Sequence, residues 1–339
     1  MESDIIVTQG LTKRYGAQTC VNRVDLHVRQ GRIYGLLGRN GAGKTTIMKM
    51  LLGLVAPTAG SVSLFGKPLA GNEREALSRI GCLIESPGFY PNLTGTENLR
   101  IFARLRGVHE EAVRSALSVV GLEYRDKKLF SQYSLGMKQR LAIALAMLHD
   151  PRLLILDEPV NGLDPIGIAE MRAFIRRLCD EQGKTVLISS HILPEIALLA
   201  DDVGILDHGV LLEEESMREL EGKQERYVRL AVSDAARAQR LLHEVYPALL
   251  AVKETRARAD GVHAGDGQKG GKHADNVHRG GNKCEVAFAE GALQLPGDAD
   301  IAAIVRLLVQ NDVDVREARV CEETLEEYFR RVTGGEGIA

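Results

Sequence analysis

The sequence predicts an α/β fold with a parallel sheet, followed by a smaller α+β unit. An apolar run at residues 33–37 leads into a glycine-rich loop and then into a helical segment that begins at residue 44. Two further short apolar runs, at residues 153–156 and 185–188, are typical of strands buried on both faces of a parallel sheet, because such strands lack polar alternation. After about residue 222 the pattern changes to short strands and helices in turn.

The glycine-rich loop, residues 38–46, has the composition of a phosphate-binding site. It lies between a predicted strand and a predicted helix, which is the context that such a loop requires. Its glycines let backbone N–H groups point at phosphate oxygens, and the helix N-terminus adds partial positive charge. We expect Lys44 to reach the β- and γ-phosphates and Thr45 to offer its hydroxyl to Mg²⁺. The sequence therefore predicts a nucleoside triphosphate site, with Gly38, Asn40, Gly41, Gly43, Lys44, Thr45 and Thr46 as binding residues.

Two acids close the apolar run at residues 153–156. Asp157 is expected to hold Mg²⁺, since a carboxylate at the carboxyl end of a strand lies beside the phosphate loop. Glu158 is expected to orient and deprotonate the attacking water. A pair of solvated turn acids is the alternative interpretation of the same two residues.

Three more candidate site residues lie at the ends of predicted elements. Ser134 and Gly136 open a helix that runs to Met147, and a serine at a helix N-terminus favours an anion, although an ordinary N-cap leaves the same pattern. His191 follows a predicted strand at the sheet edge where α/β folds bind ligands. A lone histidine is more often structural than catalytic, so its role depends on its neighbours.

The chain is predicted to divide into residues 1–222, the α/β domain, and residues 223–339, an accessory α+β domain. In the first, a capping box at Thr94 precedes one helix and Pro165 begins another that extends to about Glu181. In the second, we expect strands at 227–232, at 284–288 and from 313, and helices at 235–245, 301–309 and 324–332. A Gly/His-rich loop at about 256–283 interrupts this domain, and its irregularly spaced histidines favour a flexible linker over a metal site.

Composition excludes several classes of function. The net charge of −3 gives no global basic field for nucleic acid, and five scattered cysteines suggest neither a disulfide framework nor a zinc site. The longest apolar stretch, residues 141–148, is far too short to span a membrane, and no signal segment opens the chain.

These motifs, in this order, resemble those of the ATP-binding subunit of ABC transporters, over residues 1–222. Residues 38–45 match Walker A, 134–139 the family signature, 153–158 Walker B, 161–164 the D-loop, and His191 the switch histidine. The resemblance implies a P-loop NTPase ABC nucleotide-binding domain, in which a mixed sheet is flanked by helices and joined by a helical subdomain. It also implies that Tyr15 stacks on adenine and that Asp164 of the D-loop contributes to the nucleotide site.

The resemblance also implies partners. Two subunits, as a homodimer or with a paired ATPase, would sandwich two ATP molecules, so that Ser134 and Gly136 complete the partner's site. Because the sequence has no membrane span, the pathway is expected to be a separate transmembrane permease, with this chain peripheral on the cytoplasmic side of the cell membrane. The permease is expected to dock near residues 85–93, where Phe89 and Tyr90 are either docking residues or core residues.

Two positions depart from the family pattern. The signature normally reads Leu-Ser-Gly-Gly-Gln, whereas residues 133–137 read Tyr-Ser-Leu-Gly-Met and retain Ser134 and Gly136. Glu85 stands where most relatives carry a glutamine that senses Mg²⁺ and water, so Glu85 is a candidate catalytic residue and Mg²⁺ ligand that can accept but not donate hydrogen bonds when ionised.

The neighbourhood of Glu85 suggests export. Residues 88–99 resemble exporters of the bacitracin-resistance and lantibiotic self-protection type, which implies an ATPase powering export of an antimicrobial peptide or drug. An importer ATPase is the main alternative, although importers generally keep the glutamine. A non-transport ABC ATPase is disfavoured, since the chain has one set of motifs and no coiled coil between residues 44 and 134.

Overall fold

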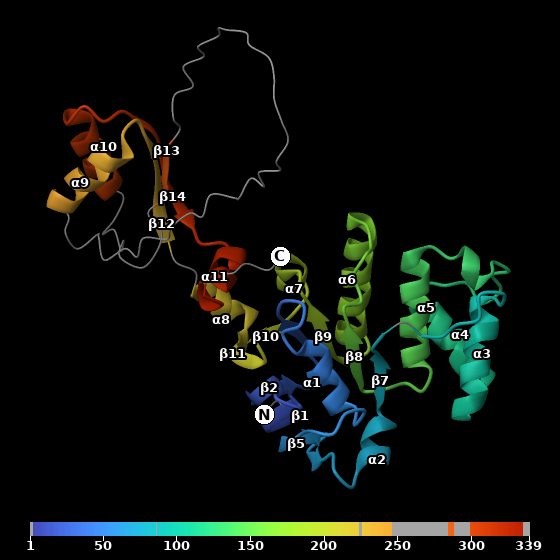
Figure 1. Ribbon diagram of the computed structural model, residues 1–339. Helices are drawn as coiled ribbons and strands as arrows, with labels where there is room; N and C mark the ends of the chain where they lie inside the picture. Colours follow the sequence, from blue (N-terminus) through green and yellow to red (C-terminus); the bar gives the residue numbers. More distant parts are fainter. Residues whose placement is uncertain (1–2, 86, 224–225, 246–283, 288–298, 335–339) are drawn as a thin grey trace, which may run out of the picture. The chain divides into compact units, whose positions relative to one another are not determined.

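The computed structural model describes residues 3–85, 87–223, 226–245, 284–287 and 299–334 (Figure 1). The chain divides into two compact units, one made of Met1–Lys223 with Leu325–Ala339 and the other of Gln224–Thr324. The sequence analysis predicted one accessory domain over residues 223–339. The structure instead groups the segment from Leu325 onward with the first unit. The Gly/His-rich loop predicted at about 256–283 lies outside the described residues.

A six-stranded sheet forms the centre of the first unit. Its order is β11-β10-β4-β9-β8-β7, with β11 antiparallel at one edge and the other strands parallel. The strands are β4 (Ile33–Leu37), β7 (Ile80–Leu83), β8 (Leu153–Asp157), β9 (Thr185–Ser190), β10 (Asp202–Asp207) and β11 (Val210–Ser216). Every residue of β4 and β9 is buried, which explains their runs without polar alternation. The carboxyl ends of these parallel strands share one edge of the sheet.

An antiparallel sheet accompanies the central one. It has the order β2-β1-β5-β6, and β3 also pairs with β1. The strands are β1 (Asp4–Tyr15), β2 (Gln18–Val24), β3 (His27–Arg29), β5 (Ala59–Leu64) and β6 (Lys67–Pro68). Helix α1 (Lys44–Leu51) contributes buried Ile47, Met48 and Leu51 to a single core that also contains residues of both sheets. This core holds the start of α1 against the central sheet.

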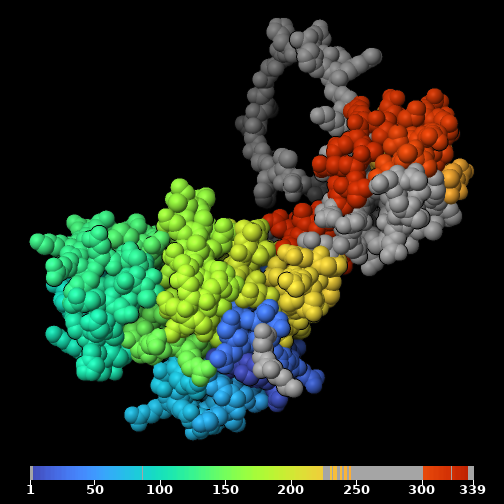
Figure 2. All heavy atoms as spheres, turned by 180° about the vertical axis from the view of Figure 1, so that it is seen from behind, coloured from blue at the N-terminus to red at the C-terminus, as the bar shows by residue number. Residues whose placement is uncertain are grey.

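Three packed helices form a lobe of the first unit. They are α3 (Gly95–Arg106), α4 (Glu110–Val119) and α5 (Leu135–Met147), and the green surface in Figure 2 shows the lobe they build. Thr94 and Glu97 form the predicted capping box of α3, and the helix begins at Gly95, immediately after the cap. Phe89 is buried against Phe102 and Phe130, with ring centroids 5.8 and 5.1 Å away, so it is a core residue; Tyr90 is 52% exposed.

The remaining helices of the first unit flank the sheets. They are α2 (Glu73–Leu77), the 3₁₀ turn η1 (Phe130–Gln132), α6 (Pro165–Asp180), α7 (Leu193–Ala197), α8 (Met217–Gly222) and α11 (Leu325–Val332). Pro165 is the first residue of α6, as the sequence predicts, and the side chain of Asp164 caps the helix.

Helix α11 belongs to the first unit because its apolar face is buried there. Tyr328 and Phe329 are almost fully buried, and Leu325 and Val332 pack on the same core, which gives the i, i+3, i+4, i+7 spacing of one helix face. The Tyr328 hydroxyl donates a hydrogen bond of 2.6 Å to Glu213 Oε2 on β11. Burial, followed by the hydrogen bond and charge of Glu213, raises the pKa of Tyr328 far above its ordinary value. The helix also contacts α7.

The second unit is a small α+β structure. Its antiparallel sheet has the strand order β13-β12-β14, with β12 (Arg226–Val232), β13 (Cys284–Ala287) and β14 (Val315–Glu322). Its helices are α9 (Ala235–Val245) and α10 (Ala299–Gln310). Leu230, Leu242, Ile304 and Leu308 are buried in its own core. All five predicted elements are present, with β14 starting two residues later than expected. Within the described part of the chain, no helix combines the length and apolarity that crossing a bilayer requires.

Candidate nucleotide-binding site

The glycine-rich loop joins β4 to α1 at the carboxyl edge of the central sheet. Gly38 N donates to Ser190 O at 3.3 Å, and Gly209 N donates to Ala42 O at 2.9 Å, so neighbouring loops hold it in place. Gly43 has a φ of +110°, and a Cβ there would lie 2.7 Å from the backbone oxygen of Cys20. A side chain is excluded at that position by both conformation and space.

Lys44 lies beneath this loop with only 5% of its surface exposed. Its ammonium donates to Gly38 O at 2.6 Å and to Arg39 O at 3.2 Å, and its Nζ lies 3.2 Å from Glu158 Oε1. Carbonyl and carboxylate oxygens therefore surround a buried positive charge at the start of α1. Such a charge is suited to phosphate oxygens, which present the same kind of acceptor.

Asp157 connects the loop helix to the neighbouring strand. Thr45 Oγ1 donates to Asp157 Oδ2 at 2.7 Å, and Ser189 Oγ donates to Asp157 Oδ1 at 2.5 Å. Asp157 and Ser189 are partners in the register between β8 and β9. The sequence predicted Thr45 and Asp157 but missed Ser189, which only the pairing of β8 with β9 brings to this carboxylate.

The oxygen donors of Thr45 and Asp157 are compatible with Mg²⁺. This ion is hard and prefers one or two carboxylates together with substrate phosphates. A hydroxyl and a carboxylate oxygen 2.7 Å apart, beside a phosphate-binding loop, supply that donor set.

Glu158 and His191 form a second close pair. His191 Nδ1 lies 2.8 Å from Glu158 Oε2, and both side chains are about four-fifths buried, with exposures of 24% and 20%. Glu158 N donates to Ser189 Oγ at 2.9 Å, and the residue has a φ of +49°. A glutamate in the left-handed region is uncommon and costs about 1–3 kcal/mol, and residues of this kind cluster at functional sites.

Glu85 follows β7 and contacts helix α1. Its φ is +67°, its side chain is 73% exposed, and Lys49 Nζ of α1 donates to its Oε1 at 2.9 Å. The hydrogen bond and charge of Lys49 lower the pKa of Glu85, and the same contact raises the pKa of Lys49. The structure thus pairs Glu85 with Lys49, a residue that the sequence did not single out.

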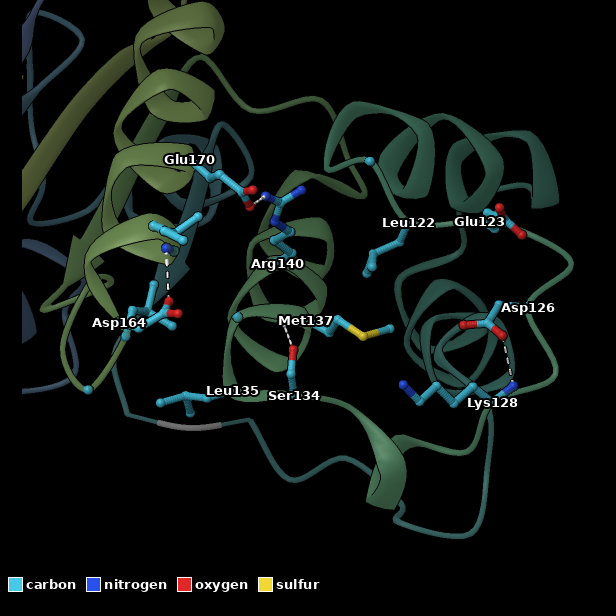
Figure 3. A pocket seen from close by; sticks show the side chains of 16 residues that line it. Leu122, Glu123, Asp126, Lys128, Ser134, Leu135, Met137, Arg140, Asp164 and Glu170 are labelled. Atoms are coloured by element: carbon cyan, nitrogen blue, oxygen red, sulfur yellow. Dashed lines mark hydrogen bonds and ion pairs between the residues drawn. The ribbon is translucent and has the colours of Figure 1, made fainter.

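The signature residues line a different cavity of about 830 Å³ (Figure 3). Ser134 and Met137 at the start of α5 lie between Asp164 on one side and Asp126 and Lys128 on the other. Ser134 Oγ accepts from Met137 N at 3.3 Å, and Asp164 Oδ1 accepts from Gly167 N at 2.9 Å. Gly136 also lines the cavity, whereas residues 38–46 do not.

The predicted residues therefore fall into separate groups. Residues 38–46, Asp157, Glu158 and His191 lie together at the sheet edge, where Asn40 and Gly41 are exposed and Thr46 is half-buried on α1. The signature residues and Asp164 line the cavity described above. Tyr15 is half-exposed at the end of β1, with Lys13 Nζ 4.9 Å from the centre of its ring.

Comparisons with known proteins agree with this geometry. Residues 21–161 match the ABC transporter family. The bacitracin transport ATP-binding protein BcrA of Enterococcus faecalis is 43% identical over 337 residues, covering 99% of this chain and 98% of the relative. The lantibiotic transport ATP-binding protein SrtF of Streptococcus pyogenes is 47% identical over 208 residues, covering 61% of this chain and 89% of the relative.

A solved structure of an ATP-binding subunit of an ABC transporter is 30% identical with a TM-score of 0.57, covering 65% of this chain and 92% of that structure. Sequence similarity along the whole chain and the shared fold lead to one conclusion. This chain belongs to the ABC transporter family as an ATP-binding subunit that hydrolyses ATP.

Proposed function

We propose that this chain powers the export of an antimicrobial peptide or drug through a separate transmembrane permease, from the cytoplasmic side of the cell membrane. The observation that carries the proposal is the 43% identity to a bacitracin transport ATP-binding protein along nearly the full length of both chains. Glu85, at the position where importers generally keep glutamine, favours export over import.

ATP is held by the loop at residues 38–46. Its backbone N–H groups and the start of α1 receive the phosphates, and Lys44 contributes its buried charge. Tyr15 stacks on the adenine. Thr45 and Asp157 would hold Mg²⁺, which would supply positive charge to neutralise the phosphates. The 2.7 Å contact between Thr45 and Asp157 supports this pairing.

Hydrolysis uses the pair of Glu158 and His191. Glu158 accepts the proton of the water that attacks the γ-phosphorus, and His191 orients the carboxylate through its Nδ1. Lys44 Nζ lies 3.2 Å from the other carboxylate oxygen of Glu158 and forms an ion pair with it.

Two ATPase subunits complete each other's sites. Ser134 and Gly136 line a cavity apart from residues 38–46 of the same chain, which supports their contacting ATP held by a second subunit. Asp164 lines the same cavity and takes part in this interface. ATP then acts as the bridge between subunits, and hydrolysis releases it.

The permease docks beside Tyr90. Phe89 is buried in the helical lobe, so Tyr90 is the exposed aromatic residue near Glu85 that is available to a partner. We further propose that the second unit, Gln224–Thr324, serves as an accessory domain.

A growth assay tests the proposal. The chain is co-expressed with a candidate permease subunit in a sensitive bacterium, and growth is measured against bacitracin, a lantibiotic and unrelated drugs. We expect resistance that disappears with Glu158→Gln in the same pair of subunits. Sensitivity to all compounds, together with ATP-dependent uptake of a solute, would instead establish an importer.

A further inference from the structure

Lys49 connects the phosphate-loop helix to Glu85. It lies four residues after Thr45 on α1, so the two side chains share one face of the helix. Its ammonium is 2.9 Å from Glu85 Oε1, and its side chain is 32% exposed. One helix thus carries the hydroxyl that contacts Asp157 and the ammonium that contacts Glu85.

The charges around Lys49 place it beside the nucleotide site. Glu85 raises the pKa of Lys49 most, and both Tyr15 and Asp157 raise it further. These two residues are the proposed adenine platform and the proposed Mg²⁺ ligand. Lys49 shares α1 with Thr45, whose hydroxyl contacts Asp157, while the direct partner of Lys49 is Glu85.

The backbone of Glu85 makes this contact specific. A φ of +67° is unusual for a glutamate and fixes where its side chain leaves the chain at the end of β7. A glutamine in this position could accept a hydrogen bond from Lys49, but it would not form an ion pair. The ion pair therefore depends on a glutamate, and not a glutamine, at residue 85.

We propose that Lys49 is a positioning residue that holds the Glu85 carboxylate beside α1, in competition with Mg²⁺ at the nucleotide site. The inference rests on the expectation that Glu85 is a Mg²⁺ ligand and on the proposed Mg²⁺ site at Thr45 and Asp157. When Lys49 holds Glu85, the carboxylate is withheld from the cation; when Lys49 releases it, the carboxylate adds a negative ligand near Asp157. Lys49 sets how much Mg²⁺ is needed before Glu85 responds to ATP.

A double-mutant cycle on the full-length protein tests this. Binding of a fluorescent ATP analogue is measured across a Mg²⁺ titration and in excess EDTA for wild type, Lys49→Met, Glu85→Gln and the double variant. We expect Lys49→Met to lower the half-saturating Mg²⁺ concentration at least threefold, without changing analogue affinity in EDTA. In the Glu85→Gln background, Lys49→Met should have no effect, because the group it positions is gone.

Two further variants keep the test specific. Lys49→Arg retains the charge and should behave as wild type. Lys67→Met removes a similarly exposed ion pair, with Lys67 Nζ 2.8 Å from Glu75 Oε1, and should leave the Mg²⁺ titration unchanged.

Two outcomes would overturn the proposal. One is an equal shift of the Mg²⁺ titration by Lys49→Met with and without Glu85, which would mean that Lys49 acts on the cation directly. The other is loss of analogue binding in EDTA, which would make Lys49 a nucleotide ligand. Neither depends on the resistance assay, so failure of the export proposal is scored separately.

Discussion

Ser189 and Asp157 lie opposite each other on neighbouring parallel strands, and the serine hydroxyl forms hydrogen bonds with both Asp157 and Glu158 at the end of β8. Ser189 Oγ donates to Asp157 Oδ1 at 2.5 Å and accepts from Glu158 N at 2.9 Å. Thr45 contacts the other oxygen of Asp157. The orientation of Asp157 and the backbone of Glu158 are therefore fixed by one fully buried side chain.

Replacing Ser189 by Ala should weaken Mg²⁺ use. The change removes the hydroxyl that orients Asp157, and loss of such supporting hydrogen bonds costs about 10- to 100-fold in metal affinity or activity. It also leaves Glu158 N without its acceptor, which should destabilise the fold by about 1–3 kcal/mol. ATPase rates across a Mg²⁺ titration and a thermal melt measure the two effects.

Ser190→Ala is the matched control for this experiment. Ser190 is equally buried, but its hydroxyl accepts from Ile192 N at 2.9 Å instead of contacting Asp157. It should leave the Mg²⁺ dependence intact. An identical shift in both variants would show that any polar deletion at the end of β9 has this effect.

Glu158→Gln should slow hydrolysis while ATP binding persists. A general base contributes about 10²- to 10⁴-fold to rate, and the amide cannot take its place. Because Lys44 and the loop are untouched, ATP should hold two subunits together, and gel filtration with Mg²⁺-ATP should show a dimer. Lys44→Ala should stay monomeric under the same conditions. A monomer for Glu158→Gln with ATP bound would contradict the shared-site proposal.

His149 should make stability fall in mild acid. Burial, and then the charge of Arg106, lower its pKa; Arg106 Nη1 donates to Nδ1 and Nε2 donates to Ile80 O, each at 3.0 Å. The unfolded chain therefore binds the proton more readily, so the stability His149 supplies is present above its ordinary pKa of about 6.5 and is lost as pH falls through the lowered value.

Thermal melts at several pH values measure this dependence. The difference in midpoint between wild type and His149→Asn should be large at pH 7.5 and shrink at pH 5.5. A constant difference for His149→Asn would refute the titration.

Phe329→Ala should strongly destabilise the first unit. Phe329 is 1% exposed in the main core, and truncating a buried phenylalanine costs about 3–5 kcal/mol. Denaturant unfolding followed by a probe in the first unit should show an earlier midpoint. Arg330→Ala, at the next and exposed position of α11, should have little effect. A neutral Phe329→Ala would mean that α11 does not stabilise the ATPase core.

Local sequence signals predicted much of the fold. Pro165 predicted the start of α6, and the glycines of residues 38–43 predicted the phosphate loop, because local backbone geometry favours these residue types there. Helix α4 was not predicted, although its buried residues Val113, Ala116 and Leu117 have the i, i+3, i+4 spacing of one helix face.

The missing parts of the site depend on contacts between distant segments. Ser189 reaches Asp157 only through the pairing of β8 with β9, and Lys49 reaches Glu85 only because α1 lies near the end of β7. Neither contact has a signature in the spacing of residues along the chain. Likewise, the apolar face of α11 predicted that the helix has a packing partner, but not which core supplies it.

The return of α11 to the first unit changes how the protein can be divided. The second unit is bounded on both sides by segments of the first, Lys223 before it and Leu325 after it, so it is inserted in the ATPase and not appended to it. A protein cut after residue 223 would lose Tyr328 and Phe329 from its interior and expose apolar surface. Splicing residue 223 to residue 325 through a short linker would retain them, which makes excision, and not truncation, the way to isolate a stable ATPase or to exchange the insert between relatives.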